Sequence, residues 1–363
     1  MDFAQYWAQA QNFVAHGGQG LYDVVGQGQQ LQRLVAYTTA PNVPLTRGLA
    51  PYPGVFLWLF SIFTAAPPGL GLALWTAFNA LAAVWLAVRV GQLFPAGRRW
   101  WAAALALTSF PVFYTLFVGQ PMILMACAVM EGYVSLRAAR PLLGGLWLSM
   151  LLLKPQYAVL LLPALLLQRQ WRAVVGAALG SGLIAAASLA VIGPDAVLSY
   201  PKALQDFTAF KDPGDVAVFA QMINWRGLIL TVDPTVSDHA GTLLTLALGG
   251  ATVLVAAWAC RRRWSEHSCE LEAQWVVLVL ATLLANYHSH VYGSVLLVGP
   301  LAALGARHGF DRLERTTLGV LLVAPPLLFA STLDLVVTDW AIRLGLLVLL
   351  GSLSWKLARS RVA

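Results

Sequence analysis

The fold class of this chain is decided by residues 69–90, "GLGLALWTAFNALAAVWLAVRV", a run of 22 residues whose only charge is Arg89. About 20 consecutive apolar residues are enough for an α-helix to cross the hydrocarbon core of a bilayer. The run lacks the strict apolar–polar alternation that marks a strand of an outer-membrane barrel. It therefore predicts a transmembrane helix.

Similar apolar runs recur along most of the chain. Hydrophobic residues make up 59% of the sequence and charged residues only 11%, whereas soluble domains carry about 25% charged residues. The composition predicts an all-α, polytopic helical membrane protein with about 10–12 membrane segments, and a single membrane domain over residues 1–363. The predicted segments are 54–66, 69–90, 100–117, 121–138, 142–153, 156–168, 173–193, 241–260, 273–287, 291–306, 316–332 and 341–356.

The orientation is predicted from the basic residues, because short basic connections stay on the cytoplasmic side of a membrane. Of the 23 Lys and Arg residues, 16 lie in connections on one side of the predicted segments. The two long polar loops, 1–53 and 194–240, are then extracytoplasmic, on the outer face of a cell (inner or plasma) membrane. The net charge of +7 is explained by this topology, so membrane lipids are expected partners and nucleic acid is not. The 16 residues are Arg89, Arg98, Arg99, Arg137, Arg140, Arg169, Arg172, Arg261, Arg262, Arg263, Arg307, Arg312, Arg315, Lys356, Arg359 and Arg361.

One segment has an uncertain path through the bilayer. Between an outside residue 53 and an inside Arg89 the chain must cross an odd number of times, yet two apolar segments lie there. The first, 54–66, is short and ends at "APPG" (66–69). We expect it to enter the membrane and bend rather than cross.

Lys154 is the most conspicuous charged residue in an apolar setting. The hairpin between Arg140 and Arg169 turns at "LLKPQYAV" (152–159) and is too short for two crossings of about 20 residues each. Its halves are expected to meet within the membrane, where a broken helix can line a cavity. A lysine there costs roughly 2.5–3.5 kcal/mol on insertion scales, which favours a role in binding an anion such as a lipid phosphate. The alternative is a lysine that extends to the interface.

Two further motifs carry candidate phosphate ligands. "ANYHSHVYG" (285–293) places His288 and His290 between two apolar segments, where imidazoles can donate to a phosphate or relay a proton. Their spacing is poor for a metal pair on a helix. "FAQMINWRGLIL" (219–230) contains Trp225 and Arg226; the arginine can bind phosphate and the indole can stack on a sugar. The alternatives are hydrogen-bonded interfacial histidines and an ordinary aromatic anchor.

The opening stretch contains the candidate base. Asp2, Gln5, Tyr6 and Gln9 recur at helical spacing, so a helix lying on the membrane could present Asp2 to the mouth of a cavity. A carboxylate there could remove a proton from a sugar hydroxyl. The alternative is an acid that only favours the start of its helix.

The order of these motifs resembles the membrane glycosyltransferases of the GT-C fold, specifically glycosyltransferase family 87, the polyprenyl-phosphate-mannose-dependent mannosyltransferases and their relatives. The resemblance covers most of residues 2–300. The motifs that carry it are "DFAQYWAQA" with "GLYD", "PYPGVFLWLF", "GQPMILMACAVM", "GLWLSMLLLKPQYAVLLLPALLLQRQWRA", "NWRGLIL" and "YHSHVYGSVLL".

This resemblance implies an extracytoplasmic, inverting transfer of a hexose, with mannose foremost, from a polyprenyl-phosphate-linked donor to a hydroxyl of a glycan or glycolipid acceptor. Asp2 takes the role of the catalytic base, and no metal or other cofactor is expected. The substrate-binding residues are then expected to be Lys154, Gln156, Arg226, His288, His290, Tyr6, Gln120 and Trp225.

The chain also departs from the family pattern. Members normally carry a transmembrane helix just before the aspartate, whereas Met1 directly precedes Asp2, so the first family helix is expected to be missing. Gly54 and Gly293 stand where a proline and an acid are frequent. Two alternatives therefore remain open: a transporter or flippase of lipid-linked sugars, or an inactive, N-terminally truncated member.

Overall fold

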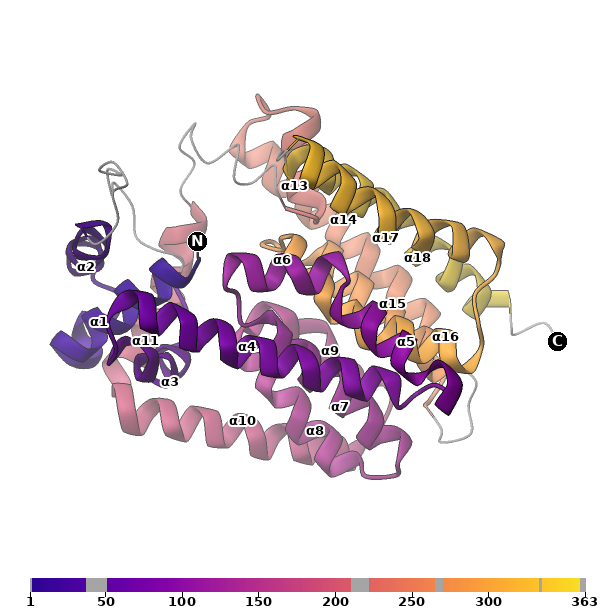
Figure 1. The fold of residues 1–363 in the computed structure, drawn as a ribbon, viewed down its shortest axis with the longest axis horizontal. Helices are drawn as coiled ribbons and strands as arrows, with labels where there is room; N and C mark the ends of the chain where they lie inside the picture. Colours follow the sequence, from indigo (N-terminus) through magenta and orange to yellow (C-terminus); the bar gives the residue numbers. More distant parts are fainter. Residues whose placement is uncertain (1, 37–50, 210–221, 265–269, 333–334, 360–363) are drawn as a thin grey trace.

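The computed structural model describes residues 2–36, 51–209, 222–264, 270–332 and 335–359. This part of the chain is built from helices, and its only β-pairing is an isolated bridge between Met222 and His290. Figure 1 shows the helices packed side by side, with α1, α2, α3 and α11 gathered at one end of the molecule. The all-α fold expected from the sequence is confirmed.

Five described helices are long and apolar enough to cross a membrane, which agrees with a polytopic membrane protein. A sixth candidate is the pair α5 (Ala96–Leu107) and α6 (Phe110–Val118), which is bent by 41° at the break between them. The five long helices are α4 (Pro68–Gly91), α10 (Trp171–Ile192), α14 (Asp238–Ala259), α17 (Arg312–Thr332) and α18 (Leu335–Arg359).

The remaining apolar segments form shorter helices. Each half of the hairpin around Lys154 is 13 residues long, or about 20 Å at 1.5 Å per residue, and neither half alone spans a core of about 30 Å. These shorter elements are α3 (Gly54–Thr64), α7 (Met122–Arg137), α8 (Pro141–Ser149), η1 (Met150–Leu153), η2 (Pro155–Tyr157), α9 (Ala158–Leu167), α15 (Leu271–Ala285), η3 (Val291–Leu297) and α16 (Val298–Arg307).

Helix α3 has only 11 residues, so its length of about 17 Å is well below that of a full crossing. It packs against α1, α4 and α10 at the crowded end of the molecule. The helix is thus too short for a full crossing, and the path of residues 54–66 through the bilayer stays a prediction.

The two polar segments are largely helical where they are described. The first contains α1 (Asp2–Gly20) and α2 (Val24–Ala36), and the second contains α11 (Pro194–Ala209) and α13 (Trp225–Val232). Amphipathic α1 buries Tyr6 and Trp7, which pack in an aromatic cluster with Tyr52 and Phe56. Residues 37–50 and 210–221, which also belong to the predicted loops, lie outside the described residues.

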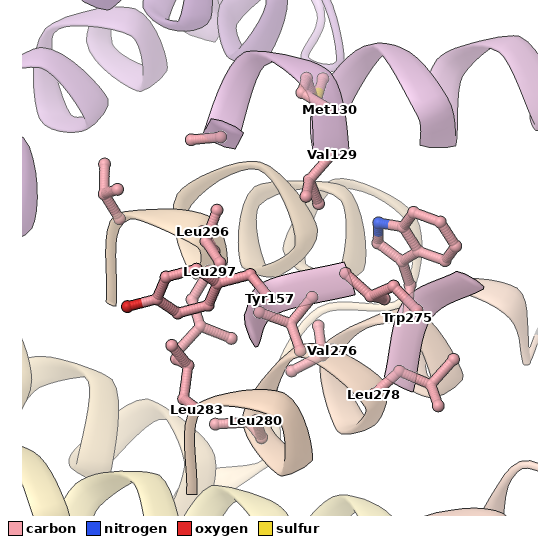
Figure 2. Packing of buried hydrophobic residues seen from close by; sticks show 14 of the residues in the cluster. Val129, Met130, Tyr157, Trp275, Val276, Leu278, Leu280, Leu283, Leu296 and Leu297 are labelled. Atoms are coloured by element: carbon pink, nitrogen blue, oxygen red, sulfur yellow. The ribbon is translucent and has the colours of Figure 1, made fainter. Parts of the chain in front are cut away.

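The main core is centred on α7 and α15. Trp275, Val276 and Leu280 of α15 have no solvent-exposed surface, and Figure 2 shows Val129 and Met130 of α7 facing the same region of the core. A helix that is apolar on all sides is expected in such a fully buried position.

Glycines allow α8 and α10 to pack closely. A Cβ atom on Gly145 would lie 1.9 Å from the carbonyl oxygen of Ala173, and one on Gly176 would lie 2.0 Å from that of Leu142. Small residues at such positions let membrane helices approach through their backbones. This contact holds α8, the first half of the hairpin that breaks at Lys154, against α10.

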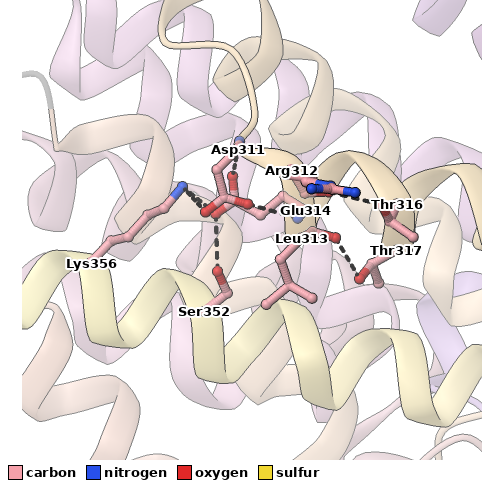
Figure 3. A network of polar contacts seen from close by, with 8 residues as sticks. All are labelled: Asp311, Arg312, Leu313, Glu314, Thr316, Thr317, Ser352 and Lys356. Carbon is pink, nitrogen blue, oxygen red and sulfur yellow. Dashed lines mark hydrogen bonds and ion pairs between the residues drawn. The ribbon is translucent and has the colours of Figure 1, made fainter.

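Ion pairs join the ends of helices that lie next to each other. Lys356 of α18 lies 2.8 Å from both Asp311 and Glu314 at the start of α17, as Figure 3 shows. Glu272 of α15 accepts hydrogen bonds from Tyr133 and Arg137 of α7 at 2.6 and 2.8 Å. Lys356 and Arg137, two of the basic residues predicted to be cytoplasmic, thus pair directly with acidic side chains.

Candidate active site

The helix break predicted at Lys154 is present. Lys154 lies between η1 and η2 in a non-helical conformation and is only 2% exposed. Its ammonium nitrogen lies 5.2 Å from the ring centre of Tyr52 and 4.7 Å from that of Tyr292, within the range of favourable cation–π contact. Among the described residues, the buried cation therefore contacts aromatic rings and has no directly bound carboxylate.

Gln120 connects this cation to Asp2. The Lys154 ammonium donates to the Gln120 side-chain oxygen, and the Gln120 side-chain nitrogen donates to the Asp2 carboxylate. An ammonium only donates and a carboxylate only accepts, so the amide must point its oxygen at Lys154 and its nitrogen at Asp2. Residues 2, 120 and 154 are thereby joined in one polar chain.

The turn between α6 and α7 places Gln120 in this position. Gly119 ends α6 with a φ of 78°, a left-handed conformation that glycine adopts at little cost. The Gly119 carbonyl accepts a hydrogen bond of 2.7 Å from the indole of Trp75. Phe3 packs against Gly119, with its backbone nitrogen 3.6 Å from the position a Cβ would take there. The same turn therefore holds both Gln120 and the start of α1.

Tyr6 supports the site through Tyr52. The two hydroxyl oxygens are 3.0 Å apart and the rings meet edge to face with centres 4.7 Å apart. Tyr22 adds a hydrogen bond of 2.8 Å to the Tyr52 carbonyl. Burial, followed by the nearby charge of Asp2, raises the pKa of the Tyr52 hydroxyl, which keeps this group protonated and able to donate.

A cavity of about 580 Å³ opens beside this cluster. Lys154 and Tyr52 line it, whereas Asp2 and Gln120 are not in the lining set and lie one layer behind Lys154. Asp2 is half-buried. The lining residues are Pro51, Tyr52, Pro53, Lys154, Pro155, Gln156, Val159, Tyr200, Pro201, Leu204, Gln205, Asn286, Tyr287, His288 and Tyr292.

Of the two candidate histidines, His288 lines the cavity, and His290 lies next to His288 without lining the cavity. Their ring centres are 4.7 Å apart, and the His290 ring lies 5.5 Å from that of Tyr292. Within the described ranges, no group of three His, Cys, Asp or Glu side chains is arranged to hold a metal. The His288 imidazole thus lies on the cavity wall, and the His290 imidazole lies between His288 and the ring of Tyr292.

Arg226 and Trp225 are placed further away. The Arg226 guanidinium stacks on Tyr287, 4.2 Å from the ring centre, and lines a separate small cavity of about 30 Å³. Trp225 donates a 2.8 Å hydrogen bond from its indole to Thr252 of α14 and is not in the set that lines the larger cavity. The structure therefore gathers Asp2, Gln120, Lys154, Gln156 and His288, with Tyr6 behind them. Neither Trp225 nor Arg226 lines the larger cavity, although Arg226 stacks on Tyr287, which does.

Several residues of the site were not singled out from the sequence. Tyr52 and Tyr292 stand inside the quoted motifs "PYPG" and "YHSHVYG", yet only the fold shows that both rings contact Lys154. Asn286 lines the cavity, and its carbonyl accepts a 2.7 Å hydrogen bond from Asn224. Tyr200 of α11 also lines the cavity. A tyrosine beside a motif proline is a weak signal, because aromatic residues are common at membrane interfaces.

This arrangement combines three functions that a group transfer requires. The cation can neutralise an anionic leaving group, the nearby carboxylate can accept a proton, and aromatic rings can pack on an apolar or sugar surface. The cation lies where the short helices η1 and η2 meet.

Comparison with known proteins relates the chain to one family of group-transferring enzymes. No curated protein and no solved structure matched it. The sequence model of glycosyltransferase family 87 matches residues 51–286, a range that contains Tyr52, Gln120 and Lys154 but neither Asp2 nor His288. Because this match covers well over half of the sequence and includes the centre of the cavity, the chain belongs to glycosyltransferase family 87.

Proposed function

We propose that this glycosyltransferase moves a hexose, with mannose foremost, from a polyprenyl-phosphate donor to a hydroxyl of a glycan or glycolipid acceptor. The transfer takes place on the extracytoplasmic side of the cell membrane and inverts the anomeric centre. The observation that carries the proposal is the polar chain from Lys154 through Gln120 to Asp2. It links a cation on the cavity wall to an acid that lies one layer behind it.

Lys154 binds the donor phosphate in this proposal. Its ammonium has three donors, and Gln120 accepts from one of them. Negative charge builds up on the phosphate as the sugar leaves, and a preorganised cation in a water-poor site stabilises that charge. His288 on the same wall adds a second donor.

Asp2 acts as the base. The acceptor oxygen attacks the anomeric carbon, its proton passes to the Asp2 carboxylate, and the bond from that carbon to the phosphate oxygen breaks. The electron pair of this bond leaves with polyprenyl phosphate. Gln120 holds one carboxylate oxygen of Asp2, which orients the acid, and the half-buried position of Asp2 leaves an approach for the acceptor beside the cavity.

The apolar part of the cavity suits a lipid-linked donor. Proline and leucine side chains of α11 and the 62%-exposed Val159 of α9 line it. An exposed valine on a membrane helix faces lipid at little cost. The prenyl chain would therefore pass from the bilayer along α9 and α11 to the phosphate at Lys154.

The test is transfer of radiolabelled hexose from polyprenyl-phosphate-hexose in proteoliposomes, with mannose and glucose donors compared. Asp2→Asn should abolish transfer and leave donor binding intact, because it removes the base but keeps a hydrogen-bond acceptor. Asp23→Asn is the matched control, since Asp23 caps α2 and asparagine caps a helix equally well. Transfer by Asp2→Asn at the rate of the unmodified protein would overturn the role of Asp2.

A second pair of variants tests the phosphate site. Lys154→Ala should weaken donor binding, with partial recovery at high donor concentration, whereas Lys202→Ala on the exposed face of α11 should leave both binding and transfer unchanged. Absence of transfer from every polyprenyl-phosphate hexose would overturn the proposed donor class.

A further inference from the structure

Helix α18 carries a buried ionic pair that the site described above does not include. Arg343 is 1% exposed and Asp339 is fully buried, and the two side chains approach to 3.9 Å one turn apart. Buried charges cost several kcal/mol each unless they are paired and hydrogen-bonded. Ionisable residues within membrane helices commonly serve a function.

The guanidinium of Arg343 binds the segment before α13 and the last turn of that helix. Its Nε donates to the Met222 carbonyl at 2.8 Å, and its Nη1 donates to the Thr231 hydroxyl at 3.1 Å. Met222 precedes α13 and Thr231 lies in its last turn. A planar guanidinium can serve two acceptors in fixed directions, which a lysine ammonium on a flexible stem does less well.

The segment held by Arg343 in turn pairs with the wall of the cavity. Met222 forms the isolated antiparallel bridge with His290, and the Ile223 amide donates to the Ser289 carbonyl at 2.8 Å. The Asn224 side chain donates to the Asn286 carbonyl at 2.7 Å. Residues 222–224 therefore lie along residues 286–290, the segment that carries His288 on the cavity wall.

We propose that Arg343 is a positioning residue for this glycosyltransferase: by fixing Met222 it sets the 286–290 wall, including His288, against Lys154. The kinetic part of this inference rests on the proposed function, whereas the structural part does not. Arg343 is not among the residues that line the larger cavity, so we place its action through the bridge and not on the substrate.

The first readout is a cross-link that needs no enzyme activity. Residues directly opposite in an antiparallel bridge have Cα atoms about 4.5–5.5 Å apart, within reach of a disulfide. The double variant Met222→Cys with His290→Cys should form a disulfide, detected by mass spectrometry of the linked peptides. Adding Arg343→Lys should abolish this cross-link in protein that still elutes as a folded species.

The second readout is hexose transfer in the chain without the added cysteines. Arg343→Lys should lower kcat about a hundredfold, as expected for a misplaced wall, with little change in KM for the donor because Lys154 is untouched. Thr231→Val removes one contact of Arg343 and should keep the cross-link. Arg137→Lys alters a partly buried arginine that pairs with Glu272 and does not line the cavity, and it should leave kcat unchanged.

The outcomes separate the two proposals. Loss of the cross-link in Arg343→Lys supports the positioning role even if no polyprenyl-phosphate hexose is a donor, in which case the proposed function fails alone. A retained cross-link, with or without a fall in kcat, overturns the inference, because Arg343 would then not act through the bridge. An equal fall in kcat for Arg137→Lys would also overturn it.

Discussion

Replacing Gln120 gives the sharpest test of the polar chain between base and cation. Gln120→Met keeps the size of the side chain but removes both of its hydrogen bonds, one from Lys154 and one to Asp2. Gln120 is 2% exposed, so water cannot readily replace these bonds. The variant should therefore leave the acid without this hydrogen bond and the cation with only its aromatic contacts.

The magnitude follows from the bonds that are lost. A hydrogen bond to a charged group contributes about 1.5–3 kcal/mol, and each 1.36 kcal/mol of transition-state stabilisation corresponds to about tenfold in rate. If the bond to Asp2 matters chiefly in the transition state, Gln120→Met should lower kcat by about 10- to 150-fold. KM for the donor should rise less, because the Lys154 ammonium is still present.

The assay is hexose transfer per folded molecule, with folding checked by thermal unfolding in detergent. Gln168→Met is the matched control, because Gln168 is also buried and hydrogen-bonded, to Cys260 and Trp264, away from the cavity. It should lose stability without a loss of kcat. A Gln120→Met protein with the kcat of the unmodified chain would refute a coupling of Asp2 to Lys154.

Three further predictions concern the support of the site and the bundle. Tyr6→Phe removes a 3.0 Å bond to Tyr52 and should cost about 1 kcal/mol of unfolding free energy, seen as a lower midpoint in thermal unfolding. Gly176→Leu places a Cβ 2.0 Å from a backbone carbonyl of α8, so the protein should fail to elute as a folded species. Hydrogen bonding to a backbone amide of α17 and to Lys356 lowers the pKa of Asp311. Its stabilisation is therefore present above the unfolded pKa and lost as the pH falls through the folded one. Asp311→Asn should destabilise at pH 7, and the difference in unfolding midpoint should shrink as the pH is lowered.

The secondary structure was largely predictable because hydropathy is a local property. Each predicted apolar segment corresponds to described helix, including the break at Lys154, where a proline follows a charged residue. Charge and proline in one apolar run violate two local preferences at once. Such a conflict marks a place where the surrounding structure must compensate, and here Gln120, Tyr52 and Tyr292 do so.

The composition of the site was less predictable because its contacts join distant parts of the sequence. Asp2 and Gln120 are 118 positions apart, yet they share a hydrogen bond, and nothing in either motif names the other. For Arg226, by contrast, the sequence suggested a role that its contacts in the fold do not single out. Its chemistry suits phosphate, but the fold stacks the guanidinium on Tyr287, and its place in substrate binding remains a prediction.

Arg343 shows which sequence signal was overlooked. It falls within the predicted apolar segment 341–356, where its charge is as unfavourable as that of Lys154 and equally indicates a specific role. Both residues are buried cations in apolar segments, but their surroundings differ. Lys154 is enclosed by aromatic rings beside a cavity, whereas Arg343 is bonded to the protein backbone.

This difference in surroundings separates two roles for a buried cation. Guanidinium donors already committed to a carbonyl and a hydroxyl rigidify the protein itself. An ammonium that faces a cavity of about 580 Å³ and is held by a neutral amide and two rings keeps its charge available for a ligand. The distinction rests on bonding geometry and not on burial, since both side chains are at most 2% exposed. It is why we place Lys154 in contact with the substrate and Arg343 behind the wall.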